Sequence, residues 1–181
     1  MLIPSVLEKD ITYLHRKYSS VRCYNVEKRG VSYMKRHEAL YPLSHHHHHT
    51  LVMANQLKKA DENSSIQQMR RDVIHFWETD GEDHFRDEEE VLLPLYAQYE
   101  SVDVDEIKEM LIQHVQIRSY VQQVRSTKKV DRLFFNKLGQ LIEKHVRLEE
   151  RVIFPMIEKA VPENYLYQAN GQFHRDSYSG F

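Results

Sequence analysis

Two short segments of the chain carry the same pattern of histidine, glutamate and proline. One is HFRDEEEVLLP, which begins at His84, and the other is HVRLEERVIFP, which begins at His145. In each segment a glutamate follows the histidine after four residues, so Glu88 corresponds to Glu149. Residues four apart lie one above the other on a helix face. Each segment can therefore offer an imidazole and a carboxylate to one metal ion or to a pair of ions.

This combination of side chains suits transition metals. Imidazole binds iron, zinc, copper and nickel, and carboxylates can bridge two ions and balance their charge. A single histidine–glutamate pair at this spacing is weak evidence, because it is also common on solvated helix faces. Two copies flanked by apolar residues favour ligands. Pro94 and Pro155 close the two segments and predict that each helix bends or ends beyond its ligands.

A run of five histidines, residues 45–49, offers further candidates. A helix turns 100° per residue, so the five cannot all face the core. The apolar pair Leu51–Val52 sets the expected phase of the helix. His48 lies three residues before Leu51 and four before Val52, so we expect it to face inward, with His47 at the edge as the fallback. His45 lies one turn before His48, and the other two histidines point more outward.

A fourth histidine of interest is His114, in the segment LIQHVQIRSYV. Leu111 and Ile117 lie three residues to either side of it, which places it on the predicted inward face. A single inward histidine is more often a core residue bonded to a neighbour. Four helices that each offer one are different, because burying so many imidazoles and carboxylates without a metal leaves costly unpaired polar groups.

The elements that must position these residues are predicted to be helices. Only 5 Gly and 5 Pro interrupt the chain, which favours long helices over a turn-rich β fold. Ser44 is the expected N-cap of the first helix and Ser65 that of the second. Apolar residues with helical spacing predict four segments, joined by short polar loops: residues 44–59, 65–99, 103–126 and 129–159. The expected fold is all-α, an antiparallel four-helix bundle.

The predicted domain organisation has three parts. Residues 1–36 form an N-terminal helical extension without an assigned role, residues 37–162 form the bundle, and residues 163–181 form a polar tail. Outside the two repeated motifs, no ligand pattern surrounds His174. Within the first motif, Asp87 and Glu90 are interpreted as part of a solvated face.

The composition limits the expected classes of binding partner and the expected cellular compartment. The formal net charge of −2 gives no basic field for nucleic acid or anionic lipid. No apolar stretch reaches the ~20 residues of a spanning helix, and the start of the chain lacks the pattern of a signal peptide. The single cysteine, Cys23, fits a reducing compartment. We expect a cytoplasmic protein without nucleic-acid or membrane partners.

The motifs resemble those of the hemerythrin-like, HHE cation-binding family. The resemblance covers roughly residues 40–160 and rests on LSHHHHHTLVMA, HFRDEEEVLLP, QHVQIRSYV and HVRLEERVIFP. It implies a four-helix bundle that holds a non-heme centre of two iron ions bridged by carboxylates. The implied ligands are His48, His84, Glu88, His114, His145 and Glu149. Glu150 is an alternative to Glu149, because some members place the last carboxylate five residues after the histidine.

The sequence departs from the family pattern at one position. Hemerythrins that carry oxygen have two histidines four apart on the third helix, and here Met110 stands four residues before His114. The resemblance therefore implies that one iron lacks a protein ligand, which His45, His47, water or an outside group could replace. This favours sensing or iron handling over bulk oxygen storage.

The sequence thus predicts a di-iron protein that binds or senses a diatomic ligand, oxygen or nitric oxide, or handles iron. We expect a binding protein rather than an enzyme, with an unidentified protein partner. One alternative is a di-iron oxidase or peroxidase-like enzyme, although ferritin-like oxidases use the order Glu-x-x-His instead. Another is an interaction module with a structural metal such as zinc, although zinc prefers a closed four-ligand site, often with cysteine.

Overall fold

The structure, a computed structural model, describes residues 36–127 and 129–174. Every regular element in this part of the chain is helical, which confirms the all-α fold class. No helix there is both long and apolar enough to cross a membrane. The predicted N-terminal extension lies outside the described residues, apart from Arg36.

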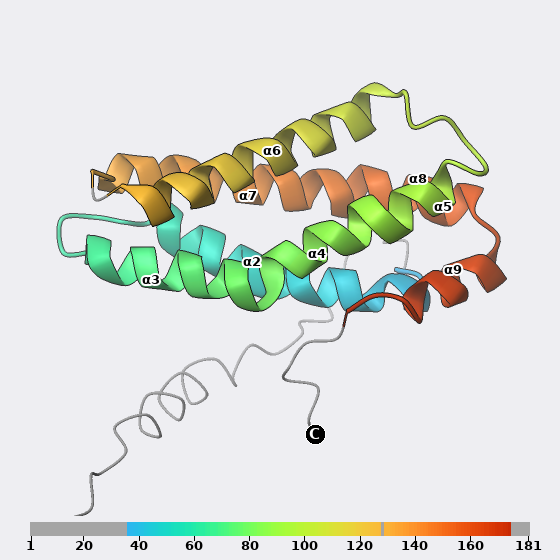
Figure 1. Ribbon diagram of the computed structural model, residues 1–181, viewed down its shortest axis with the longest axis horizontal. Coiled ribbons are helices and arrows are strands. Elements are labelled where there is room, and N and C mark those ends of the chain that lie inside the picture. Colours follow the sequence, from blue (N-terminus) through green and yellow to red (C-terminus); the bar gives the residue numbers. More distant parts are fainter. Residues whose placement is uncertain (1–35, 128, 175–181) are drawn as a thin grey trace, which may run out of the picture. The chain divides into compact units, whose positions relative to one another are not determined.

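Four helical segments run back and forth along the long axis in Figure 1, each reversing the direction of the one before. Three of them are built from several consecutive elements, because short 3-10 or π-helical stretches adjoin or interrupt the α-helix. The segments are η1 (Glu38–Leu40) with α2 (Tyr41–Lys58); α3 (Ile66–Phe76), η2 (Trp77–Gly81), α4 (Glu82–Arg86), η3 (Asp87–Leu92) and α5 (Leu93–Tyr96); α6 (Asp105–Ser126); and α7 (Arg132–Leu148), η4 (Glu149–Ile153) and α8 (Phe154–Ala160).

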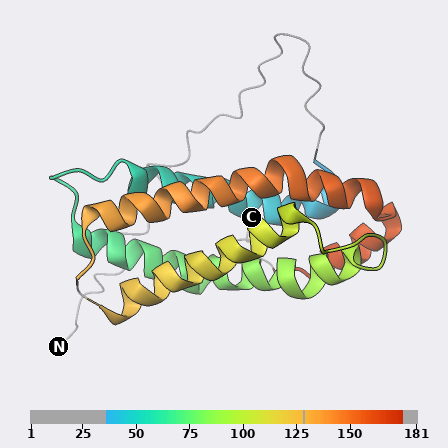
Figure 2. The same ribbon diagram turned by 90° about the horizontal axis from the view of Figure 1, so that it is seen from above.

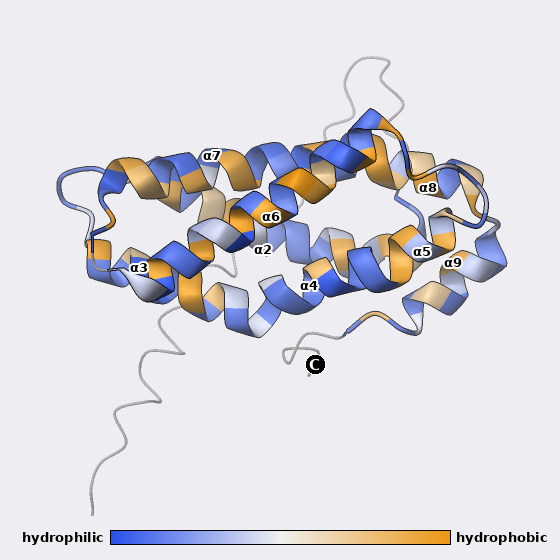
Figure 3. Cartoon of the chain, turned by 45° about the horizontal axis from the view of Figure 1, so that its top comes forward, coloured by the Kyte–Doolittle hydropathy of each residue, from blue (hydrophilic) through white to orange (hydrophobic). Residues whose placement is uncertain are grey.

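The segments lie side by side, with α2 against α7 and with α6 against both α3 and α7 (Figures 1 and 2). Each long helix carries both hydrophobic and hydrophilic residues (Figure 3), as expected for helices with one buried face. The buried apolar residues form two clusters. One contains Leu43, Met110 and Phe154, and the other contains Leu57 and Phe135. Along each segment the polar candidates lie where one cluster meets the other, so they form a buried layer at mid-length.

The first helix begins earlier than its predicted cap. It starts at Tyr41, with Pro42 in its first turn, and the preceding 3-10 turn is capped by the His37 side chain. Ser44 therefore lies inside the helix, and its prediction as N-cap is wrong. Pro42 explains the difference, because its fixed φ suits the first helical turn. Ser65 does cap its helix, since its hydroxyl accepts a hydrogen bond from the Gln68 backbone N–H.

The predicted polar tail is also wrong over residues 163–174. Helix α9 (Glu163–Asn170) follows α8 directly and packs beside η1. Its Leu166 and Ala169, together with Phe173, are buried in an apolar cluster. Three apolar residues spaced three and four apart among polar ones were too few to reveal a helix in the sequence. Residues 175–181 lie outside the described part of the chain.

Gly139 allows the close approach of α7 to α2. A Cβ atom at this position would lie 2.6 Å from the Ala54 carbonyl oxygen and 2.9 Å from Lys58 N. Because both are backbone atoms, the helices would have to separate. We expect Gly139→Ala to lower the free energy of unfolding of the metal-free protein by about 1–3 kcal/mol, despite the better helix propensity of alanine.

Urea denaturation followed by circular dichroism measures this effect. Gly171→Ala is the matched control, because the nearest atom to its added Cβ is 3.4 Å away. Equal stability of Gly139→Ala and wild type would show that the backbone contact does not limit the packing of the two helices.

Candidate metal centre

The buried polar layer contains side chains from all four helical segments. Each of six residues in it is at most 5% exposed. They are His47 on α2, His84 on α4, Glu88 on η3, His114 on α6, His145 on α7 and Glu149 on η4.

These six side chains form two groups that share both glutamates. Within each group, one possible ligand atom per residue lies within 4.8 Å of the others. The groups are His47, His84, Glu88 and Glu149, and His114, His145, Glu88 and Glu149. Two overlapping groups with two common carboxylates are the arrangement that a pair of bridged metal ions requires.

The two glutamates each turn one oxygen toward each group. For Glu88, Oε1 lies 3.4 Å from His84 Nε2, and Oε2 lies 3.4 Å from His114 Nε2. For Glu149, Oε2 lies 3.0 Å from His47 Nε2, and Oε1 lies 3.3 Å from His114 Nε2. Each carboxylate therefore presents one oxygen to each group of histidines.

The polar atoms of this layer fit a metal better than they fit each other. Both oxygens of Glu88 and both ring nitrogens of His145 are buried without a hydrogen-bond partner among the described residues. His47 Nε2 and His84 Nε2 point at each other across 2.9 Å. A buried polar atom without a hydrogen-bond partner is costly. Convergent nitrogen and oxygen donors would be satisfied by a cation between them.

The structure corrects the predicted phase of the histidine run. His48 is exposed, whereas His47 is 2% and His46 is 4% exposed. The expectation that His48 faces inward is therefore wrong, and the fallback His47 takes its place in the cluster. The pair Leu51–Val52, from which the phase was taken, is only half-buried. Leu57 is 2% exposed and marks the inward stripe better.

A second pair of carboxylates, Glu89 and Glu150, contacts the histidines of α2 and α6, the two helices without the repeated motif. Glu150 Oε1 lies 2.6 Å from His47 Nδ1, and Glu89 Oε1 lies 2.6 Å from His114 Nδ1. Such contacts to the far nitrogen fix the orientation of a ligand ring and raise its basicity. Glu150 thus contacts the outer nitrogen of His47 and does not join the shared cluster, whereas Glu149 does. The sequence reasoning missed Glu89, although it directly follows Glu88 just as Glu150 follows Glu149.

Each outer carboxylate is in turn held by an arginine. Arg36 donates to Glu150 Oε2 at 2.9 Å, and Arg118 donates to both oxygens of Glu89 at 2.8 and 2.9 Å. Arg36 also contacts the backbone carbonyl of Glu150 at 2.6 Å. The His–Glu–Arg series is therefore present twice, once on each side of the centre. No sequence motif signals the arginines, because they come from other segments of the chain than the glutamates: Arg36 precedes η1, and Arg118 lies on α6.

Phenylalanine rings complete the two series. Phe85 stacks on the His114 ring at 3.7 Å between centroids, and Phe154 lies parallel to the His47 ring at 5.3 Å. Arg118 lies over Phe85, and the other arginine lies over Phe154. The rings cover one side of His47 and His114 and limit the rotation of their imidazoles.

The two shared glutamates lie where their helices widen into π-helical turns. The N–H of Leu93 donates to the carbonyl of Glu88, and that of Phe154 donates to Glu149, each across five residues. Pro94 follows the first of these bonds directly, as a proline follows the second. A proline cannot donate and clashes with the carbonyl four residues earlier, and the wider turn relieves this. The prolines therefore do not end the helices, and π-bulges of this kind are frequent at functional sites.

The carboxylates also set the charges of the histidines in this layer. Burial lowers the pKa of His47, but the Glu149 and Glu150 carboxylates outweigh it and raise the pKa to about 10. Burial likewise opposes three carboxylates at His114, whose pKa rises to about 11. Burial lowers the pKa of His145 to about 3. His47 and His114 are thus cationic and balance the negative charge of the buried carboxylates.

Met110 is fully buried in the apolar cluster beside the centre. It offers no histidine, but neither group of candidate ligands lacks one, because each contains two histidines and two glutamates. Leu111, by contrast, was placed on the inward face and is 37% exposed, so the buried face of α6 is narrower than predicted.

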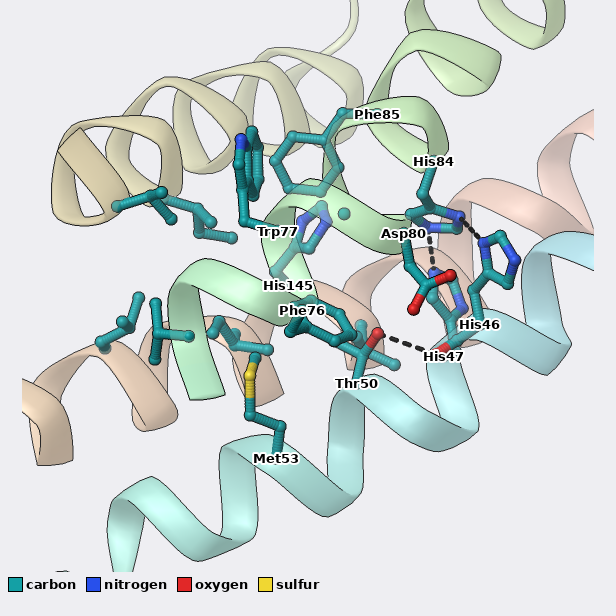
Figure 4. Close-up of a pocket in the computed structure, with 17 residues that line it drawn as sticks. His46, His47, Thr50, Met53, Phe76, Trp77, Asp80, His84, Phe85 and His145 are labelled. Carbon is teal, nitrogen blue, oxygen red and sulfur yellow. Dashed lines mark hydrogen bonds between the residues drawn. The ribbon is translucent and has the colours of Figure 1, made fainter. Parts of the chain in front are cut away.

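A cavity of about 30 Å³ adjoins the centre (Figure 4). His47, His84 and His145 form part of its wall, and most of the remainder is apolar, including Met53 and Trp77. One water molecule needs at least about 10–15 Å³ on this measure. The cavity therefore has room for a molecule of two heavy atoms.

A comparison with protein-family models matches residues 39–157 to the hemerythrin HHE cation binding domain. Comparisons with curated proteins and with solved structures found no significant match.

Proposed function

Because the chain belongs to the hemerythrin HHE cation-binding family, we propose that its buried cluster holds two iron ions and that a diatomic ligand, oxygen or nitric oxide, binds them in the adjoining cavity. Glu88 and Glu149 would bridge the ions. His47 and His84 would complete one site, and His114 and His145 the other. This proposal takes the four segments as the antiparallel four-helix bundle that the sequence predicts.

One observation carries the proposal: the two candidate groups share both carboxylates. A structural zinc ion is fully coordinated by four ligands, so it would not require a second group of ligands. Mixed imidazole and carboxylate donors suit iron. When bound, iron supplies the affinity for the gas. The protein supplies the ligands, keeps their orientation through Glu89 and Glu150, and surrounds the cavity with apolar side chains that limit the access of water.

Metal analysis and visible absorption of the full chain, expressed without an affinity tag, test this function. We expect about two irons per chain and an absorption change that appears when oxygen or nitric oxide is added to the reduced protein and reverses when the gas is removed. Oxygen consumption without recovery of the starting spectrum would favour the oxidase alternative. One zinc per chain, or a colourless protein without metal, would contradict the proposal.

Metal uptake is expected to release about two protons per chain at pH 7, because His47 and His114 have pKa values of about 10 and 11 without metal and must lose a proton from Nε2 to bind. Burial and the neighbouring Glu149 raise the pKa of Glu88 to about 7, which adds a fraction of a third proton. The pKa values of His47 and His114 both lie above the pH range of 6 to 8. The overall affinity for the metal pair therefore increases with pH, by roughly 100-fold per pH unit when two protons are released.

Calorimetric titration with Fe²⁺ under anaerobic conditions, in two buffers of different ionisation enthalpy, measures the released protons. The exposed His48 offers the control, since His48→Ala is expected to release the same number. An affinity independent of pH between 6 and 8 would contradict the assignment of cationic His47 and His114.

A further inference from the structure

A second group of polar side chains lies next to the candidate metal centre and is not part of it. It consists of His46, Asp87 and His174. His46 is 4% and Asp87 7% exposed. The interpretation of Asp87 as part of a solvated face is wrong, because its side chain is largely buried and contacts His174.

The contacts in this group form a continuous series from the chain's C-terminal region to a candidate ligand. Asp87 Oδ2 accepts from the backbone N–H of His174 at 2.9 Å and lies 2.5 Å from its Nδ1. The His174 ring lies 4.5 Å from the His46 ring, between centroids. His46 Nδ1 in turn lies 3.3 Å from His84 Nδ1. Figure 4 shows His46 and His84 facing each other beside the cavity.

The direction of the His84 ring determines what His46 can do. His84 Nε2 faces the centre, 3.4 Å from Glu88 Oε1 and 2.9 Å from His47 Nε2. A neutral imidazole has one nitrogen with a lone pair and one with a proton. If Nε2 presents its lone pair to a metal ion, the proton is on Nδ1, which then donates to His46 Nδ1. His46 must present its own lone pair there.

We infer that His46 is a positioning residue that holds the ligand His84 in the tautomer with its lone pair on Nε2, and that Asp87 and His174 hold His46 in place. The inference rests on the proposed metal centre. His46 gives His84 the same kind of support that Glu150 gives His47. Three of the four ligand histidines thereby have an acceptor at the nitrogen that faces away from the metal.

Asp87 also links this support to the bridging carboxylate. It directly precedes Glu88 on η3, and its side chain points to His174 while Glu88 contributes to the cluster. The segment after α9 is fixed by the burial of Phe173, which is 4% exposed. This places the His174 ring against His46 and closes that side of the centre.

Release of metal to a chelator tests the inference in the full chain, loaded with Co²⁺ alone so that visible absorption reports the ligand geometry. His46→Leu removes the acceptor. We expect one of the two ions to leave about 10–100 times faster, as is typical when an outer-shell partner of a ligand is lost, with a changed Co²⁺ spectrum for that ion only. His46→Asn keeps an acceptor near the Nδ1 position and is expected to restore the wild-type rate and spectrum.

Asp87→Asn and His174→Ala test the outer part of the series. Both are expected to change the same ion in the same direction as His46→Leu, but less, and they keep the test valid if His46→Leu does not fold. His48→Leu, on the exposed side of the same helix, is the matched control and is expected to behave as wild type.

Three results would overturn the inference. One is a wild-type release rate and spectrum in His46→Leu. Another is a stoichiometry of one ion in both His46→Leu and His46→Asn, which would make His46 a ligand itself. The third is equal acceleration of both ions, which would indicate general loosening of the fold. A wild-type chain that binds no pair of ions would overturn the proposed function as well. The metal content of the wild-type chain shows this before any variant is compared.

Discussion

Replacing Glu149 with glutamine is expected to abolish binding of the metal pair rather than of one ion. Glu149 turns Oε2 toward His47 and Oε1 toward His114 and His145, so its carboxylate belongs to both candidate sites. An amide has one oxygen acceptor and no negative charge, and it cannot bridge two cations. The expected loss of affinity exceeds the roughly 10–100-fold that outer-shell changes cause. Equilibrium dialysis with Fe²⁺ under anaerobic conditions measures it.

Glu150→Gln is the matched control at the next position. Glu150 contacts His47 Nδ1 and Arg36 and contributes no atom to the shared cluster. This variant is expected to keep two ions per chain, bound about 10–100-fold more weakly. The reverse result, a lost pair in Glu150→Gln and a retained pair in Glu149→Gln, would assign the bridge to the carboxylate five residues after His145. Circular dichroism of both metal-free variants separates loss of ligand from loss of fold.

Within the histidine run, His47→Ala is expected to remove one ion and His48→Ala neither. His47 is 2% exposed, and its Nε2 lies 3.0 Å from Glu149 Oε2. His48 is exposed on the other side of the same helix. The first variant leaves His84 as the only histidine in its group. It is expected to bind about one iron per chain at concentrations that give two in wild type.

The paired comparison makes this prediction sharp, since both variants remove one imidazole from the same five-residue run. Loss of an ion in His48→Ala, with two ions retained in His47→Ala, would show that α2 turns a different face to the core. Equal loss in both would indicate that the run acts as one flexible chelating segment. Metal content after gel filtration gives the answer, with the absorption spectrum as a second readout.

The sequence was sufficient to predict the all-helical fold and most of the candidate site. His84, Glu88, His145 and Glu149 could be named because the motif repeats, and His114 because it stands alone among apolar neighbours. All five are in the buried cluster. The ligand role of the six residues stays a prediction until metal is measured.

The histidine run was harder to interpret for a physical reason. Five identical side chains carry no periodicity of their own, so the phase of the helix had to come from neighbours. Leu51 and Val52 were the nearest apolar residues, but they lie at the side of the buried stripe. The more distant Leu57, eleven residues after His46, would have pointed to the His46–His47 pair, because eleven residues are close to three complete turns.

The support of the ligands could not be found by helical spacing at all. Arg36 and Arg118 meet their glutamates across 114 and 29 residues of the chain. His174 meets Asp87 across 87 residues. Such contacts depend on which helices become neighbours, and a single sequence does not specify this.

The π-helical turns at Glu88 and Glu149 amount to a single extra residue in each of two helices. An added residue rotates everything beyond it by about 100° and advances it by 1.5 Å. The residues before and after each turn therefore follow different helical registers. As a result, the apolar clusters on the two sides of the polar layer need not share one register. Each apolar cluster can accept substitutions that suit its own packing while the polar layer between the clusters keeps its geometry. Deleting one residue from η4 would bring the two ends of that helix into a common register and turn part of its buried face toward solvent.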